Sequence, residues 1–395
     1  MKSIEQIAQF FNDSEYFTGS VKINENLAGH TTMHVGGSAK LFFEPENEES
    51  LIFAIKELDA DVRRLTQIKS FFVLGGGSNV IISDSGLDAV ISTRKMNKIK
   101  FLTEGSEYTE SLIKREKLLN PEISLCSPKL CEEFKTLQID SGSSWGNVIS
   151  FCKKENLGGF EAFTGLSGTV GGALFMNATC FGLSACDNLL SVRYFDLRDG
   201  EIHEYQKIDS DWGYKKSPFQ SGIKEFDADE HRLTRMKNGD FKGLAPLGEG
   251  AGGNGEAIGA EGKTFPFPLP TAHCSLLISK IILSAKFSVK NGFDSEKSEK
   301  CISDRKEKGH FRAPSAGSAF KNDAAHGIIA GKVIDECGLK GFSVGGAQIA
   351  PWHGNFIINP EQKASAEDVK KLSDEVKKIV REKTGVELEN EILFI

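Results

Sequence analysis

Two glycine-rich segments constrain the fold of this chain more than any other feature. The first, Gly75-Gly76-Gly77-Ser78-Asn79, lies between two short apolar runs, 71–74 and 80–82, which are typical of strands. The second holds six glycines within residues 158–173. Loops without Cβ atoms leave backbone N–H groups open to phosphate oxygens. Together the segments predict two walls of one site for an extended anionic ligand such as a dinucleotide.

Neither segment is a familiar nucleotide-binding motif. A P-loop needs Gly-Lys-Ser/Thr opening a helix, and a Rossmann fingerprint needs GxGxxG between a strand and a helix. The loop at 75–79 has no Lys, and the element that follows it is predicted to be a strand. A tight hairpin between the two strands therefore stays open as an alternative for this loop.

Composition narrows the class of protein. The chain has 395 residues, 41 of them Gly, and 39% hydrophobic residues, which favours a globular protein of two or three domains over collagen or a disordered chain. The net charge of −7, with acidic and basic residues interleaved, predicts no nucleic-acid partner. The eight Cys form no CxxC pair and no metal-ligand spacing, so we expect reduced thiols, no metal and a cytoplasmic location. The start of the chain resembles no signal peptide, and no apolar run reaches the ~18 residues of a membrane helix.

Capping residues predict two helices, one in the first part of the chain and one in its last part. Residues 47–58 predict a helix capped by Asn47. A capping box at Ser365 predicts a second helix that ends at Gly385, followed by a terminal strand over 386–395. In that strand, alternate residues change from acidic to apolar at Glu391, which predicts a partly buried carboxylate. Two segments, 103–135 and 222–270, are predicted to be insertions.

Three further segments carry side chains that could do chemistry. They are Pro314–Asn322 with Ser318, the run Tyr214-Lys215-Lys216-Ser217, and the segment from Gly345 to Asn359 with His353. Each alone is more typical of an ordinary turn or of a surface histidine than of a catalytic site. No GxSxG surrounds Ser318, so an esterase nucleophile is not expected.

Taken in order, these segments resemble the UDP-N-acetylenolpyruvoylglucosamine reductase family, also called UDP-N-acetylmuramate dehydrogenase. The resemblance spans residues 24–395 apart from the two insertions. Its closest blocks are Asn24-Glu25-Asn26-Leu27 with Gly36-Gly37, the loop at 75–79, the segment at 314–322, and residues 330–359 with Leu388-Glu389-Asn390-Glu391.

The resemblance implies an α+β protein with an FAD-binding PCMH-type region of two subdomains and a C-terminal α+β substrate-binding domain. We predict subdomain 1 at 1–97, subdomain 2 at 98–304 and the substrate domain at 305–395. It also implies FAD and NADPH as cofactors, UDP-N-acetylglucosamine enolpyruvate as substrate, and UDP-N-acetylmuramate as product for peptidoglycan synthesis. We further expect a monomer, and the apolar runs predict no membrane attachment.

The resemblance also assigns residues. Ser318 matches the proton donor, Glu391 the catalytic carboxylate, and Lys215 the position of a catalytic Arg. The predicted substrate-binding residues are Tyr214, Lys308 and His353. The predicted FAD-binding residues are Gly75, Gly76, Gly77, Ser78, Asn79, Gly165, Gly168, Thr169 and Gly172.

The sequence departs from the family at three places. Lys215 supplies the positive charge of the usual Arg but not its two-pronged geometry. The usual Ile-Pro-Gly is Leu166-Ser167-Gly168, and the usual Asn-Ala-Gly is Asn177-Ala178-Thr179. Two alternatives stay open: an FAD oxidase or dehydrogenase of another small alcohol or sugar on the same fold, and a non-enzymatic sensor that binds flavin or a UDP-sugar.

Overall fold

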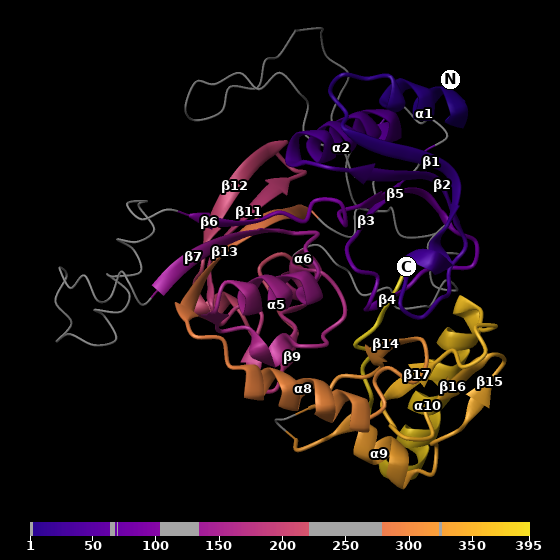
Figure 1. Ribbon diagram of the computed structural model, residues 1–395. Helices are drawn as coiled ribbons and strands as arrows, with labels where there is room; N and C mark the ends of the chain where they lie inside the picture. The colour runs from indigo at the N-terminus through magenta and orange to yellow at the C-terminus, as the bar shows by residue number, and fades with distance from the viewer. Residues whose placement is uncertain (1–2, 64–67, 69, 103–133, 221–278, 324–325) are drawn as a thin grey trace, which may run out of the picture. The chain divides into compact units, whose positions relative to one another are not determined.

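The computed structural model describes residues 3–63, 68, 70–102, 134–220, 279–323 and 326–395 (Figure 1). It combines helices with mainly antiparallel sheets, which confirms the predicted α+β class. The predicted insertion at 222–270 lies outside the described residues. So does the predicted insertion at 103–135, except for its last two residues, which begin strand β7 (Phe134–Asp140).

The first sheet has the strand order β1-β2-β5-β3. Its bounds are β1 Gly19–Asn26, β2 Ser38–Pro45, β5 Leu87–Ser92 and β3 Phe71–Leu74. Helix α1 (Ile4–Asn12) and helix α2 (Glu48–Arg63) share a buried cluster with this sheet. The side chain of Asn47 accepts a hydrogen bond from the Ser50 amide at 2.8 Å, so the predicted cap is confirmed and the helix runs beyond residue 58.

The second sheet has the order β12-β11-β13-β7-β6, and all of its neighbouring strands are antiparallel. Its helices begin at polar caps: the side chain of Ser144 accepts from the Asn147 amide at the start of α5, and that of Thr169 from the Gly172 amide at the start of α6. This sheet and the two helices share a buried core that is rich in aromatic side chains: Trp145, Phe160, Phe163 and Phe287. The elements are β6 Ile99–Leu102, α5 Trp145–Lys154, β8 Leu157–Gly158, α6 Val170–Met176, β9 Thr179–Cys180, β10 Leu183–Ser184, β11 Leu189–Asp196, β12 Glu201–Gln206 and β13 Lys280–Asn291.

The third sheet has the order β14-β17-β16-β15 and shares a core with helices α9 and α10. Helix α10 (Ala366–Thr384) begins with the predicted capping box at Ser365 and ends at Gly385, whose φ of 74° is left-handed. Both predicted ends of this helix are confirmed. The other elements are α8 Ser295–Glu307, β14 Ser315–Ser318, α9 Ala330–Glu336, β15 Ser343–Val344, β16 Ala347–Ile349 and β17 Phe356–Ile358.

The terminal segment differs from its prediction. Only Leu393–Phe394 forms a strand, β18, and it pairs in parallel with β4 (Val80–Ile81). Residues 386–391 are irregular, because their backbone groups bond to other loops rather than to a neighbouring strand. The exposed fraction nevertheless falls at Glu391 as predicted, since its side chain is 12% exposed.

The three larger sheets take their strands from residues 19–92, 99–291 and 315–358. The division predicted between residues 304 and 305 falls inside α8. The domain boundaries at 97 and 304 stay predictions.

Candidate active site

The first glycine loop joins two strands that belong to different sheets. β3 pairs with β5 in the first sheet, whereas β4 pairs with β18 from the end of the chain, so the tight-hairpin alternative is wrong. Gly77 has a φ of 63°, and a Cβ there would collide with the carbonyl oxygen of His30. Both features require glycine at this position.

The two glycine-rich segments contact each other, whereas the sequence predicted only that they form two walls of one ligand site; that site stays a prediction. A Cβ on Gly76 would meet the backbone of Gly168, and a Cβ on Gly75 would lie 2.7 Å from Oγ1 of Thr169. The hydroxyl of Ser78 donates to the carbonyl of Ser167 at 3.4 Å. Several glycines therefore permit close contact between the loops themselves.

The loops offer hydrogen-bond donors that the protein does not use. Within the described part of the chain, no backbone N–H of residues 75–79 donates a hydrogen bond. The hydroxyls of Ser141 and Ser143 are buried and unpartnered, and the backbone carbonyls of these two residues accept from Gly171 at 2.8 Å and Val170 at 2.9 Å. These donors fit the phosphate and carbonyl oxygens of FAD. Sequence reasoning missed the segment 141–144, although its Ser-Gly-Ser-Ser run between a strand and a helix was a usable signal.

Lys215 and Glu391 form an ion pair with Nζ and Oε1 2.6 Å apart. Their side chains are 13% and 12% exposed, so water screens the pair only partly. Lys215 lies in a two-residue turn that is closed by reciprocal backbone hydrogen bonds between Gly213 and Lys216. Its φ of 54° is rare for a residue with a side chain and is typical of functional sites.

Glu391 also connects the glycine loop to the segment that carries Ser318. Its backbone N–H donates to the carbonyl of Ala319 at 2.8 Å, and its carbonyl accepts from Nδ2 of Asn79 at 3.0 Å. Ser318 ends β14, directly before Ala319, and is partly buried. The glycine loop and the Ser318 segment, which are far apart in the sequence, therefore both bond to the backbone of Glu391, whose carboxylate pairs with Lys215.

The predicted substrate-binding residues fall into two groups. Tyr214 is 54% exposed, and its hydroxyl accepts from the amide of Asn322 at 3.4 Å, beside the segment of Ser318. Lys308 forms an ion pair with Asp304 at 2.9 Å, and His353 stacks on Phe356 with ring centroids 4.1 Å apart.

Lys308 and His353 lie close enough to interact electrostatically. Burial, and then the charge of Lys308, lower the pKa of His353. Neither residue forms an ion pair or hydrogen bond with Lys215 or Glu391 among the described residues. We call the pair of Lys308 and His353 the neighbouring surface.

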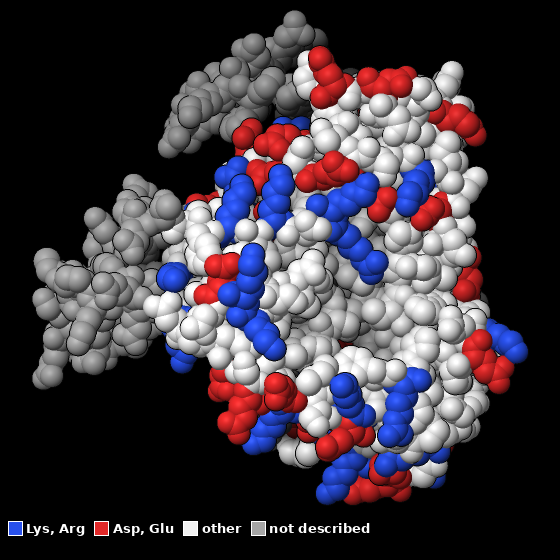
Figure 2. Space-filling view, in the orientation of Figure 1, with Lys and Arg blue, Asp and Glu red and all other residues white. Residues whose placement is uncertain are grey.

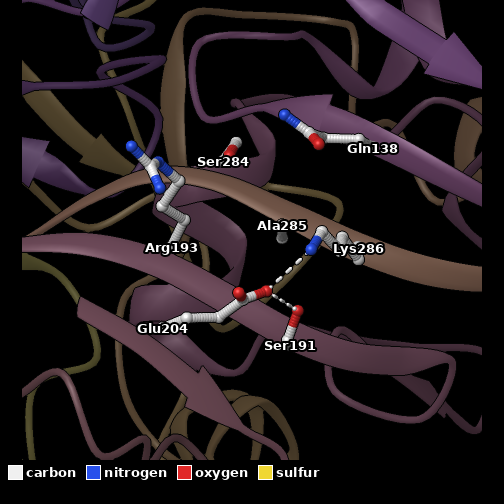
Figure 3. A pocket seen from close by; sticks show the side chains of 7 residues that line it. All are labelled: Gln138, Ser191, Arg193, Glu204, Ser284, Ala285 and Lys286. Atoms are coloured by element: carbon white, nitrogen blue, oxygen red, sulfur yellow. Dashed lines mark hydrogen bonds and ion pairs between the residues drawn. The ribbon is translucent and has the colours of Figure 1, made fainter. Parts of the chain in front are cut away.

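A small hollow is lined by side chains from β7, β11, β12 and β13 of the second sheet (Figure 3). It has a volume of about 160 Å³. In this hollow, Oε1 of Glu204 accepts hydrogen bonds from Nζ of Lys286 at 2.9 Å and from the hydroxyl of Ser191 at 2.7 Å. Arg193 forms an ion pair with Glu48. None of the predicted site residues lines this hollow, so we do not assign it to catalysis.

The parts of the chain that the structure describes contain no cluster of three or more metal-ligating side chains, and no helix long and apolar enough to span a membrane. Five cysteines in these parts are free thiols.

Comparison with known families agrees with this geometry. Residues 124–206 match the family described as FAD binding domain, and these residues include the segment 141–144 and the second glycine loop. The chain is therefore a flavoprotein with an FAD-binding region and a C-terminal α+β domain. Residues 309–395 match the C-terminal domain of UDP-N-acetylenolpyruvoylglucosamine reductase. The chain belongs to the UDP-N-acetylenolpyruvoylglucosamine reductase family, because relatives with that name are more than 30% identical over nearly its full length.

Two such relatives are similar to the chain from end to end. The UDP-N-acetylenolpyruvoylglucosamine reductase of Treponema denticola is 34% identical over 383 residues, which cover 95% of this chain and 94% of the relative. The enzyme of the same name from Borreliella burgdorferi is 31% identical over 375 residues, which cover 94% of this chain and 93% of that relative. The crystal structure of UDP-N-acetylenolpyruvylglucosamine reductase from Thermus caldophilus has the same fold, with a TM-score of 0.56 and 24% sequence identity. The match covers 96% of this chain and 99% of that structure's chain.

Proposed function

We propose that this protein reduces UDP-N-acetylglucosamine enolpyruvate to UDP-N-acetylmuramate for peptidoglycan precursor synthesis, with FAD as bound cofactor and NADPH as reductant. The observation that carries the proposal is the meeting of the Lys215–Glu391 ion pair, Asn79 and the Ser318 segment. When bound, FAD supplies hydride chemistry between NADPH and the enolpyruvyl group. The loop amides of residues 75–79 and the hydroxyls of Ser141 and Ser143 would hold it.

The residues fit the charge that develops in this reaction. Hydride addition to the terminal carbon of an α,β-unsaturated carboxylate moves negative charge toward the carboxylate. Lys215 would stabilise that charge, and Glu391 holds its ammonium group in place at 2.6 Å. Because both side chains are mostly removed from water, the attraction is stronger than at the surface.

Ser318 would deliver the proton to the other carbon. One hydride from NADPH and one proton from the Ser318 hydroxyl convert the enol ether to the lactyl ether, and solvent then returns a proton to Ser318. No side-chain hydrogen bond of Ser318 occurs within the described residues, so its hydroxyl is available. Tyr214, Lys308 and His353 are proposed to bind the UDP-sugar, the last two through the neighbouring surface.

We further propose a cytoplasmic monomer that binds no nucleic acid and no membrane. The five free thiols support a reducing compartment. On the face shown in Figure 2, Lys and Arg lie interspersed with Asp and Glu, as expected for a protein without a basic nucleic-acid-binding surface. Gel filtration with light scattering tests the monomer, and a dimer mass would contradict it.

The decisive experiment separates the two half-reactions. Anaerobic NADPH should bleach the yellow flavin of the purified protein, and the enolpyruvyl UDP-sugar should then restore its absorbance with formation of UDP-N-acetylmuramate. In Ser318→Ala, the first step should stay normal and product formation should be lost. Normal turnover by this variant would exclude Ser318 as the proton donor. The alternative, an FAD oxidase or dehydrogenase of another small alcohol or sugar, predicts bleaching by such a substrate and no reaction with the enolpyruvyl UDP-sugar.

A further inference from the structure

Arg305 is a buried cation without a carboxylate partner. The residue lies on α8 and is 6% exposed. Its Nε is buried with no hydrogen-bond partner, and its Nη2 donates to the sulfur of Cys180 at 2.7 Å. No acidic side chain in the described ranges forms an ion pair with it. An isolated buried charge is costly, so this guanidinium is expected to meet an anion when the protein works.

Cys180 cannot supply that negative charge. Burial raises the pKa of its thiol, and this effect outweighs the opposing effect of Arg305, so the thiol stays neutral. The thiol is presented by a two-residue turn between β9 and β10, in which Phe181 and Gly182 both have positive φ, 47° and 78°. The guanidinium carbon of Arg305 also lies 5.4 Å from the ring centroid of Phe181. The turn therefore fixes the direction of Arg305 without neutralising it.

Arg305 packs beside the second glycine loop. Its Cδ lies 3.0 Å from the position that a Cβ on Gly165 would take, in the second glycine loop. The thiol that it contacts is also within range of the charges of Lys215 and Glu391, which lower and raise the pKa of Cys180 respectively. Arg305, Lys215 and Glu391 thus share one electrostatic environment.

The charge balance of this environment points to a monoanion. Lys215 and Glu391 neutralise each other as an ion pair, and Lys215 lacks the two-pronged geometry that Arg offers a carboxylate. Arg305 leaves one positive charge uncompensated. We propose that Arg305, positioned by Cys180, binds the carboxylate of the enolpyruvyl group. This inference rests on the proposed function and names a substrate-binding residue for it.

The test compares two ligands that differ only in the enolpyruvyl group. UDP-N-acetylglucosamine carries the same diphosphate and sugar but no carboxylate. In Arg305→Gln, the KM for the enolpyruvyl UDP-sugar should rise by about 100-fold, the size expected when one partner of a buried charge pair is removed. The inhibition constant of UDP-N-acetylglucosamine should change less than about threefold, within the effect of a surface substitution. FAD content and the rate of flavin reduction by NADPH should stay normal.

Other outcomes would overturn the proposal. Equal weakening of both ligands would assign Arg305 to the diphosphate, and loss of FAD would assign it to the cofactor. No change in the KM would leave it without a role in binding.

Two further variants keep the test valid if Arg305→Gln does not fold. Arg305→Lys keeps the charge but loses the two-pronged geometry, so its KM should rise less than that of Arg305→Gln. Cys180→Ala removes the positioning thiol with no change of charge, and it should raise the KM with a smaller change in kcat. An unchanged KM in both variants contradicts the proposal.

A matched control and the wild type complete the design. Arg381→Gln removes the same charge from α10, where the side chain is 58% exposed, and should behave as wild type. If wild-type protein is bleached by NADPH but not reoxidised by the enolpyruvyl UDP-sugar, the proposed function itself fails. If wild type completes both steps and only the Arg305 results disagree, the failure belongs to this inference alone.

Discussion

At the scale of single residues, Gly77 shows the strongest steric requirement. It needs a left-handed φ and also has no space for a Cβ beside the carbonyl of His30. Gly200 has a similar φ of 73° but open space around it. We expect Gly200→Ala to cost about 1 kcal/mol of unfolding free energy, and Gly77→Ala about 3 kcal/mol with loss of bound flavin. Urea unfolding measures the free-energy cost of each substitution, and flavin absorbance measures the bound flavin. Equal losses of unfolding free energy in the two variants would contradict the steric argument.

His310 makes the stability of the protein depend on pH. Burial, and then the charge of Arg305, lower its pKa from 6.5 to about 4. The folded state thus favours neutral imidazole, while the unfolded chain protonates near pH 6.5. The stabilisation is complete above pH 6.5 and falls as the pH drops toward 4, by about 1 to 2 kcal/mol, because solvent screens part of the effect at this partly buried side chain.

His310→Phe should remove this pH dependence, because a phenyl ring can still pack on Phe356, whose centroid lies 4.7 Å away. Unfolding free energies at pH 7 and pH 4.5 should differ less in the variant than in wild type. The same difference in both proteins would show that His310 does not contribute.

Lys215 can be tested through the half-reactions. Lys215→Ala removes the cation beside Glu391 and should slow flavin reoxidation by substrate about 100-fold or more, as expected for the loss of a charge that stabilises the transition state. Flavin reduction by NADPH should be unchanged. Stopped-flow absorbance measures each step, and equal losses in both steps would argue against this role.

At the scale of elements, the short strand β18 holds Glu391, the proposed catalytic carboxylate, next to the glycine loop. The amide of Leu393 donates to the carbonyl of Asn79 at 3.0 Å, two residues after Glu391. Leu393→Pro removes this donor, whereas Leu393→Ala removes only side-chain contacts. We expect Leu393→Pro to reduce kcat for substrate reduction about 100-fold, the cost of misplacing catalytic groups by about 1 Å. Leu393→Ala, the matched control, should lose much less activity, and similar losses would rule out the backbone pairing as the cause.

Local sequence signals predicted the elements whose partners lie nearby. The caps at Asn47 and Ser365 and the glycine at 385 lie within a few residues of the groups that they satisfy. The terminal strand was predicted too long because residues 386–391 bond to loops about 70 and 310 positions earlier, which no local pattern reveals. Arg305 was missed for the same reason, since its partner Cys180 is 125 positions away.

At the scale of the whole molecule, hydrogen bonds connect loops beside the first sheet with β14 of the third sheet and with the start of α10. Asp84 accepts from the amides of Ala366 and Glu367 at the start of α10, at 2.9 and 3.1 Å, and Thr32 donates to the carbonyl of Ser315 at 2.6 Å. Asp84→Ala should cost about 1 to 2 kcal/mol, as for the loss of a helix cap. Thermal unfolding followed by far-UV circular dichroism measures this, with the exposed Asp199→Ala as a control. An unchanged transition would show that these bonds do not hold the segments together.

The family resemblance predicted the reaction and the residue set, while composition and periodicity predicted only the class of fold. The geometry adds which residues meet: Lys215, Glu391, Asn79 and the Ser318 segment converge, whereas no ion pair or hydrogen bond among the described residues connects Lys308 or His353 with Lys215 or Glu391. Whether Lys215 replaces the usual Arg alone, or together with Arg305, depends on distances that a sequence does not contain.

The pairing of β18 with β4 has a consequence for biosynthesis. Glu391 reaches the glycine loop only after residues 391–395 have been made, about 310 positions after the loop itself. A nascent chain that already contains every glycine of the cofactor loops therefore still lacks the carboxylate that we propose to be catalytic. The segment 391–395 must leave the ribosome before it can pair with the glycine loop, so translation products that stop before Glu391 should be unable to reduce substrate even if they retain flavin.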